Sequence, residues 1–352
     1  MSQVITAAVE KSGEPAGALD TARVGDWWFY KFSPILATFY ATAALAGGSL
    51  LPLLGRLLVL LLSLVVGAVY VSMVNDWTDL ADDAAGGKAN RLAGRSPRFI
   101  GLALGGCLVL GAGFGWYFWQ LDRLSALLYL GSWVAYSLYS LPPARLKVRG
   151  LAGVLADAAG AHFFPLLLTV ALASRWTGQA VAPAWWAAIG AWALASGIRN
   201  ILWHQLADAE ADDQAGVDTF VRRRGVRLAQ RLGQWLAFPV EIGSFGMVLL
   251  LLGPGQLAWA VLLLGLYAGL EWCRWRIWGY RPAVLAPDSR LVLNDYYQFF
   301  FPLALLLAQA LRYPADALVL VLHGVLFGRS VQQFGQEAGQ YARILLRKAT
   351  GR

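Results

Sequence analysis

Long apolar runs alternate with short polar segments along almost the whole chain. The second run is nearly unbroken Leu, Val, Ala and Gly from Leu57 to Val74, long enough to cross most of a bilayer. The pattern predicts an all-α, polytopic membrane bundle of about nine transmembrane helices. The predicted spans cover about 27–51, 53–74, 99–119, 124–141, 151–173, 185–206, 232–252, 256–271 and 296–311. A shorter apolar stretch at 317–328 leaves a tenth crossing open.

Composition agrees with this pattern. The chain has 352 residues, of which 58% are hydrophobic and only 14% are charged, whereas soluble domains average about 25% charged residues. Residues 1–23 lack the apolar core of a signal peptide, and we expect them to form a flexible cytoplasmic tail. We expect residues 24–312 to form the bundle, and residues 313–352 to form a C-terminal segment that is first apolar and then basic.

The net charge of +8 is concentrated in the loops that follow the second, fourth, sixth and eighth runs. By the positive-inside rule, these loops and the N-terminus lie in the cytoplasm. We therefore expect a multi-pass protein of a bacterial-type plasma membrane, with anionic lipids rather than nucleic acid as partners of the cations. The two cysteines suggest neither a disulfide framework nor a metal pair, and no protein partner is inferred.

An acidic stretch ends the second run. If the helix continues past the run, Asn75, Asp79 and Asp83 lie at i, i+4 and i+8 and, together with Asp76, point to one side. Like charges stacked on one helical face are destabilising unless a positive charge neutralises them. Oxygen ligands at this density suit Mg²⁺. A solvated helix end is the simpler alternative for this stretch alone, and Asp82 is expected to be a bystander.

A second acidic pair ends the sixth run. Asp208 and Asp212 lie at i, i+4, and they follow the first stretch by about 130 residues. Two such clusters, each after an even-numbered run, suggest facing walls of one site that hold Mg²⁺ ions and, through them, a diphosphate. An allylic diphosphate is the natural substrate, because its hydrocarbon tail can lie among apolar helices while its head meets the metals.

Three segments resemble motifs of the UbiA superfamily of intramembrane prenyltransferases. Asn75-Asp76-x-x-Asp79-x-x-x-Asp83 is similar to the first aspartate-rich motif, and Asp208-x-x-x-Asp212 to the second. The segment 139–150 looks like the family's loop between the fourth and fifth helices. The resemblance implies a UbiA-like bundle that moves a prenyl group from an allylic diphosphate to a small-molecule or lipid acceptor, most commonly an aromatic quinone precursor.

The resemblance also implies roles for single residues. Asp79 and Asp208 would be the central catalytic carboxylates. The implied Mg²⁺ ligands are Asn75, Asp76, Asp79, Asp83, Asp208 and Asp212. The cations expected to hold the diphosphate are Arg91, Arg145 and Lys147, although topology alone would also explain Lys147. The family often has a basic residue where this chain has Asp213, which leaves open whether one phosphate contact is lost or moved to Arg199 or Arg222.

Four further polar residues are candidates for contact with the acceptor or for support of the metal ligands. His204 and Gln205 lie one turn before Asp208, although a structural role for His204 is an equal alternative. Asp157 lies inside a predicted span, where an ionisable side chain is by default a functional candidate. Tyr139 lies near the mouth of the fourth span.

Other functions remain open at this point. Within the superfamily, the same motifs would suit a terpene cyclase or a transferase that uses another diphosphate donor. A transporter or lipid-binding protein could keep the bundle without the chemistry, but it would not need both acidic clusters complete.

Overall fold

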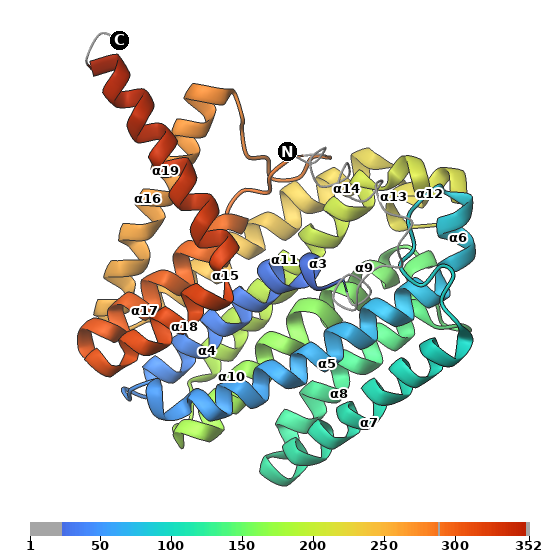
Figure 1. Cartoon of the computed structure of the whole chain (residues 1–352), viewed down its shortest axis with the longest axis horizontal. Coiled ribbons are helices and arrows are strands. Elements are labelled where there is room, and N and C mark those ends of the chain that lie inside the picture. The colour runs from blue at the N-terminus through green and yellow to red at the C-terminus, as the bar shows by residue number, and fades with distance from the viewer. Residues whose placement is uncertain (1–22, 288, 350–352) are drawn as a thin grey trace.

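The computed structural model describes residues 23–287 and 289–349, and within these ranges the protein is almost entirely helical. A single isolated bridge, between Ala283 and Leu291, is the only extended pairing in the described part. Figure 1 shows α5, α7, α8 and α10 running side by side, with α16 to α19 gathered at the opposite side of the bundle. The expected N-terminal tail, residues 1–23, lies outside the described residues apart from Arg23.

The main helices have the following bounds: α3 Val24–Trp27, α4 Ser33–Leu45, α5 Leu54–Thr78, α6 Leu80–Ala85, α7 Pro97–Leu121, α8 Arg123–Ser140, α9 Leu151–Ala158, α10 Phe164–Thr177, α11 Pro183–Ala207, α12 Ala209–Ala215, α13 Phe220–Arg224, α14 Val226–Leu232, α15 Phe238–Leu251, α16 Pro254–Trp278, α17 Phe301–Arg312, α18 Ala317–Leu326 and α19 Gly328–Ala349. Short 3₁₀-helices connect some of them: η2 Leu51–Leu53, η3 Leu146–Val148 and η7 Pro314–Asp316.

Five helical stretches of the described chain are long and apolar enough to cross a membrane: Leu51–Thr78, Pro97–Leu121, Leu151–Thr177, Val226–Leu251 and Pro254–Trp278. A sixth is added if Pro314–Leu326 and Gly328–Ile344, which are bent by 84° relative to each other, form one broken span. The predicted all-α membrane bundle is therefore confirmed, whereas the number of nine crossings stays a prediction.

Four long helices contain a single wide π-helical turn, and each of these turns comes just before a proline. The turns are η1 Trp28–Phe32, η4 Ala159–Phe163, η5 Gly233–Ala237 and η6 Tyr296–Phe300. The prolines are Pro34, Pro165, Pro239 and Pro302. Proline has no N–H and its ring clashes with the carbonyl one turn earlier, so the helix must locally change its hydrogen-bond register. Two of these turns, η1 and η4, bring residues to the cavity described below.

A long helix is interrupted within or at the start of each acidic stretch. Asp79 lies between α5 and α6 with φ −104° and ψ 3°, and Asp208 lies between α11 and α12 with φ −91° and ψ 0°. Helix α5 therefore continues past the apolar run as far as Thr78, and Asp79 separates it from α6. The spacing survives the break, because the Asp83 N–H still donates to the Asp79 carbonyl at 2.8 Å, and the Asp212 N–H to the Asp208 carbonyl at 2.9 Å.

A buried ion pair joins α11 to α15. The Arg199 guanidinium donates two hydrogen bonds to the Glu241 carboxylate, at 2.7 and 2.6 Å, and both side chains are fully buried. Arg199 also donates to the backbone carbonyls of Val284 and Val292 and to the Asn294 side chain. A charge pair buried in this way is tolerated only when its remaining donors are satisfied, and here they are.

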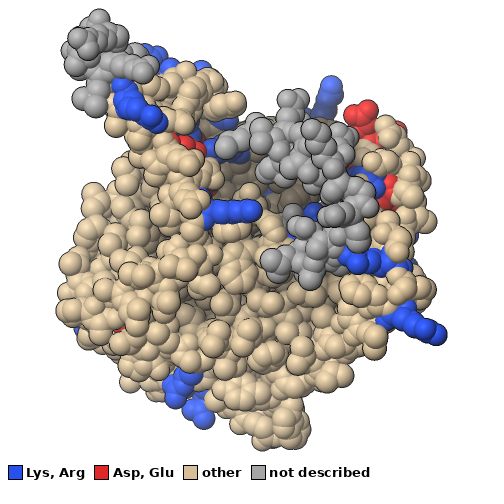
Figure 2. All heavy atoms as spheres, viewed as in Figure 1, with Lys and Arg blue, Asp and Glu red and all other residues tan. Residues whose placement is uncertain are grey.

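The surface is divided into an apolar belt and charged rims. In Figure 2 the face over α4, α5, α7 and α10 is almost entirely without charge. Acidic and basic side chains gather at the edge where α6 and α12 lie, and a few cations mark the opposite edge. Such a belt is typical of a protein that is solvated by lipid around its middle.

Candidate active site

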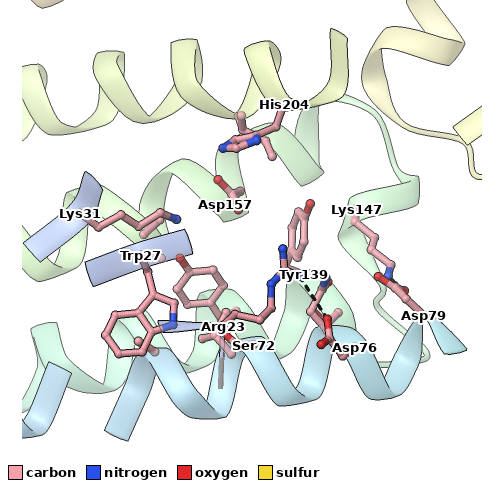
Figure 3. A pocket seen from close by; sticks show the side chains of 18 of the residues that line it. Arg23, Trp27, Lys31, Ser72, Asp76, Asp79, Tyr139, Lys147, Asp157 and His204 are labelled. Carbon is pink, nitrogen blue, oxygen red and sulfur yellow. Dashed lines mark hydrogen bonds and ion pairs between the residues drawn. The ribbon is translucent and has the colours of Figure 1, made fainter. Parts of the chain in front are cut away.

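A cavity of about 420 Å³ lies between the two acidic stretches and extends among α5, α8 and α10. The predicted site residues that line it are Asn75, Asp76, Asp79, Asp83, Arg91, Tyr139, Lys147, Asp157, His204, Gln205, Asp208 and Asp212. Arg145, the remaining predicted residue, contacts carboxylates at the mouth. Residues more than 130 positions apart in the sequence are thus brought to one cavity, with side chains from several helices converging on it (Figure 3).

The loop between α8 and α9 supplies two cations to the first acidic stretch. Arg145 approaches the Asp79 carboxylate at 3.3 Å and also contacts Asp82, while the Lys147 ammonium contacts Asp79 directly. Arg145 adopts the left-handed backbone conformation, with φ 35°, at the start of η3. Asp82 was expected to be a bystander, but it lines the cavity and is paired.

Asp76 and Asp83 are held from two other directions. Arg23 donates to the Asp76 carboxylate at 3.1 Å. The Asn90 amide donates to the Asp83 carboxylate at 2.7 Å and to the Asp76 carbonyl at 2.8 Å. The second carboxylate oxygen of Asp76 is buried and has no hydrogen-bond partner among the described residues.

Lys88 bridges the second acidic pair. Its ammonium lies 3.2 Å from the Asp208 carboxylate and 3.1 Å from that of Asp212. Burial disfavours the charged ammonium, but the two carboxylates outweigh this and raise the pKa of Lys88. Burial also raises the pKa of Asp212, against the opposing effect of Lys88. Carboxylates and cations therefore lie close together in the site.

Close packing of α6 on α12 brings the two acidic stretches together. A Cβ atom added at Gly86 would lie 3.0 Å from the Ala211 carbonyl oxygen and 3.3 Å from the Ala215 Cβ. A residue without a side chain at position 86 therefore lets the ends of the two acidic segments approach.

Lys147 is the most buried cation of the mouth, with only 5% of its surface exposed. Burial lowers the pKa of Lys147 to about 8, and Asp212 acts in the opposite direction. A cation so poorly hydrated gains more from an anionic partner than a cation on the open surface.

The deep part of the cavity is mainly apolar. Its walls are formed by Leu64, Gly67, Ala68 and Val71 of α5, Tyr129, Trp133 and Tyr136 of α8, and Ala161, Pro165 and Leu168 of the η4–α10 segment. Tyr70, next to this wall, stacks on Trp133 at 4.5 Å between ring centroids. A hydrocarbon chain fits such walls, whereas a charged group fits only the mouth.

Between the mouth and the apolar depth lie Asp157 from α9, His204 from α11 and Tyr139 from α8, with Lys31 from η1 pointing toward them (Figure 3). Gln205 lines the same region, and its side-chain oxygen accepts from the Val221 N–H at 3.3 Å, so it also anchors α13.

Sequence reasoning missed Arg23, Lys31, Lys88 and Asn90 as site residues. Lys88 and Asn90 follow the first acidic stretch within a few positions, so proximity to the motif could have indicated them. Arg23 and Lys31 precede or begin the first span and carry no motif, and only the fold brings them to the cavity.

Two suggested phosphate contacts lie elsewhere. Arg199 is enclosed by Glu241 and does not line the cavity. Arg222 is paired with Asp213 at 3.0 Å and Asp218 at 2.9 Å. Both are used structurally, because each already has carboxylate partners.

The donor set suits a hard divalent cation. No three Asp, Glu, His or Cys side chains of the described chain converge on one point as they would in a metal site made by protein alone. Mg²⁺, however, is commonly held by one or two carboxylates together with substrate phosphates. The buried, unpartnered oxygen of Asp76 and the Asp208 and Asp212 carboxylates, which share the Lys88 ammonium, are oxygen donors that fit such a cation.

Solved structures of one archaeal protein are similar to this chain. A UbiA homologue from Archaeoglobus fulgidus, solved with GPP and Mg²⁺, matches with a TM-score of 0.54 and 15% identity, covering 85% of this chain and 99% of that one. The homologue bound to DMAPP and Mg²⁺ matches with a TM-score of 0.54 and 16% identity, over 83% and 98% of the two chains. At these identities the likeness supports the fold.

The same homologue bound to Cd²⁺ matches with a TM-score of 0.53 and 16% identity, over 83% of this chain and 97% of that one. No curated protein sequence matches this chain. The UbiA prenyltransferase family matches residues 35–301, a segment that contains both acidic stretches and most of the cavity wall. The chain therefore belongs to the UbiA prenyltransferase family.

Proposed function

We propose that this protein is an integral membrane prenyltransferase that moves a prenyl group from an allylic diphosphate to an acceptor. The observation that carries the proposal is the single cavity with two acidic stretches and several cations at its mouth and apolar walls in its depth. This polarity matches that of a prenyl diphosphate, which has a multiply charged head and a hydrocarbon tail. The archaeal homologue was solved with such ligands, GPP and DMAPP.

Mg²⁺, held by Asn75, Asp76, Asp79 and Asp83 on one wall and by Asp208 and Asp212 on the other, would supply positive charge that stabilises the departing diphosphate. Arg91, Arg145 and Lys147 would bind the remaining phosphate oxygens, and Lys88 and Arg23 add two further cations at the mouth. Asp79 and Asp208 would be the central carboxylates of the two walls.

In the proposed reaction the allylic C–O bond breaks and the diphosphate leaves with the bonding electron pair. The acceptor then donates an electron pair to the allylic carbocation and loses a proton. The apolar wall formed by α5, α8 and α10 holds the tail and excludes water from the cation. The aromatic rings of Tyr136 and Trp133 line this wall, where their faces can stabilise positive charge.

The acceptor would enter the part of the cavity between mouth and depth, beside Tyr139, Asp157 and His204. We propose an aromatic or quinone-precursor acceptor, because an electron-rich ring is a good nucleophile and fits a partly apolar space. The mouth would face the cytoplasm, because the loops around it are rich in lysine and arginine.

The test is to replace Asp79 and Asp208 separately with Asn and to measure Mg²⁺-dependent transfer from a labelled prenyl diphosphate in proteoliposomes. Each variant should lose activity by about 100-fold or more, the size typical when one group that stabilises transition-state charge is removed. Asp122→Asn, at the start of α8 and away from the cavity, is the matched control and should keep its activity.

A labelled panel of donors and aromatic acceptors, with product masses as readout, identifies the substrates. Full activity in both the Asp79 and the Asp208 variant would contradict the proposal. Tight, Mg²⁺-dependent binding of a non-hydrolysable prenyl thiodiphosphate without turnover of any donor would favour a binding protein instead.

A further inference from the structure

A second cavity, of about 450 Å³, lies outside the candidate active site. It is formed where the start of α9 meets α13 and α14, and it shares no lining residue with the first cavity. Its lining includes three arginines, Arg149, Arg223 and Arg224, and several apolar residues, among them Leu151 and Leu228. We call this cavity the arginine groove.

The arginines of the groove carry more positive charge than the protein neutralises. Arg149 donates to the Pro143 carbonyl at 2.7 Å. Arg223 donates to Asp218 at 3.2 Å, but the same carboxylate also accepts from Arg222 at 2.9 Å. Arg224 has no ion pair or hydrogen bond from its side chain in the described part of the chain. Each guanidinium has five N–H donors, so most donors around the groove are available to a ligand.

The chemistry of these donors fits a phosphate. Guanidinium groups bind phosphate oxygens with two parallel hydrogen bonds, and groups from separate elements can surround one phosphate. Arg149 comes from the loop before α9, and Arg223 and Arg224 come from α13, so the groove approaches a ligand from two sides.

The apolar residues that line the groove are followed along their helices by further exposed leucines. Leu151 is 48% exposed and Leu228 46% exposed. One turn further along α9, Leu155 is 42% exposed, and two turns beyond Leu228, Leu236 is 58% exposed. Exposed leucines on the surface of a membrane protein face lipid. The groove therefore combines three arginines with two rows of lipid-facing leucines that lead away from it.

We propose that the arginine groove binds one anionic glycerophospholipid from the leaflet on the side of the active-site mouth. Its phosphate would lie among the three arginines, and its acyl chains would follow the exposed leucines of α9 and of the α14–η5 segment. A free phosphate would contact only the arginines and would leave the apolar residues of the groove exposed to water. Basic pockets at the ends of membrane helices commonly bind anionic headgroups.

The bound lipid would connect two segments that carry residues of the candidate active site. Arg149 is two residues after Lys147, which contacts Asp79. On the other side, α13 begins at Phe220, directly after Thr219, which lines the active-site cavity near Asp212. The lipid therefore connects the loop that carries a diphosphate cation with the segment that follows the second acidic pair.

Native mass spectrometry of the purified full-length protein tests the proposal. The protein is exchanged into detergent with equal amounts of phosphatidylglycerol and phosphatidylcholine. We expect one phosphatidylglycerol to be retained in preference to phosphatidylcholine. In R149Q/R223Q/R224Q this preference should fall by about fivefold for each arginine removed. Equal retention of the two lipids by the unmodified protein would overturn the proposal.

The matched control is R98Q/R227Q/R231Q, which removes three exposed arginines that do not line the groove. The control should keep the preference for phosphatidylglycerol, and an equal loss in both triple variants would show a general charge effect and overturn the site. A second variant, Ala152→Phe, fills the groove without changing its charge and should also displace the lipid.

Competition separates a lipid from a free anion. Inorganic phosphate and glycerophosphoglycerol, at the concentration at which phosphatidylglycerol binds, should not displace the retained lipid. Displacement by either compound would overturn the assignment to a lipid. These readouts do not use catalysis, so they are independent of the proposed transferase activity.

Discussion

The buried Arg199–Glu241 pair and the charged mouth of the candidate active site are arranged in opposite ways. The Arg199–Glu241 pair is fully buried, bidentate and surrounded by backbone carbonyls that use its remaining donors. The mouth of the candidate active site instead leaves charge partly exposed: the Asp208 side chain is 57% exposed, and one buried oxygen of Asp76 has no partner among the described residues.

This difference in exposure and hydrogen bonding indicates a structural role for the buried pair and a ligand-binding role for the charges at the mouth. Saturated charges hold helices together, because any further ligand would have to break existing bonds. Charges that line a cavity and share their partners can exchange them for a ligand at little cost. The comparison predicts that the two groups respond differently to the loss of one carboxylate.

The largest effect on stability is expected for Glu241→Gln. The substitution leaves the buried Arg199 guanidinium with only neutral partners, and removing one member of a buried ion pair typically costs about 3–5 kcal/mol. Thermal unfolding in detergent, followed by the loss of monodisperse protein, measures the change. The double variant R199M/E241L should recover most of the lost stability, and an equally unstable double variant would contradict this account.

A smaller effect is expected for Gly153→Ala. An added Cβ would lie 2.5 Å from the Leu146 carbonyl oxygen and 2.9 Å from the Lys147 Cα, so the loop that carries Lys147 must shift. Overpacking of this kind costs about 1–3 kcal/mol. If the proposed function is correct, the KM for the prenyl diphosphate should also rise, because Lys147 moves away from the mouth.

Gly101→Ala in α7 is the control for this prediction. Apart from the neighbouring backbone of α7, no described atom lies within 4 Å of the added Cβ at position 101, and the residue is exposed. Stability and KM should both stay unchanged in this variant. A Gly153→Ala protein that behaved like Gly101→Ala would show that the loop does not need its present position.

The smallest effect on stability is expected for Asp208→Asn. The carboxylate is more than half exposed and shares Lys88 with Asp212, so the unfolding free energy should change by less than about 1 kcal/mol. The same variant is expected to lose prenyl transfer. Loss of stability comparable to that of Glu241→Gln would place Asp208 among the structural charges and remove the contrast between the two groups.

Much of the fold follows from the sequence, because apolar runs of this length have few alternatives to membrane helices. The four-residue spacing of the acidic side chains is a local property, so the sequence alone predicts which of them share a face. The hydrogen bonds across Asp79 and Asp208 keep this spacing despite the helix breaks. The breaks themselves were not predictable from periodicity, because Leu80–Ala85 and Ala209–Ala215 continue a helical pattern.

The cations of the site were harder to assign from sequence. Arg145 and Lys147 lie in a segment with a recognisable pattern. Arg23, just before the first predicted span, and Lys31, near its start, reach the cavity only through packing. Arg199 is the reverse case. An arginine near the second acidic pair is a plausible phosphate ligand by sequence, but Glu241 of α15, 42 residues away, binds its guanidinium instead.

The apolar depth of the active-site cavity sets how much water can reach the reacting carbon. A prenyl tail that fills the space beside Leu64, Gly67 and Trp133 would itself exclude water from the cavity. A shorter tail would leave room for water next to the allylic cation. On the proposed chemistry, we expect short donors to be diverted toward prenyl alcohol and long ones to reach the acceptor. Tail length would then govern product purity, a property separate from affinity and from rate.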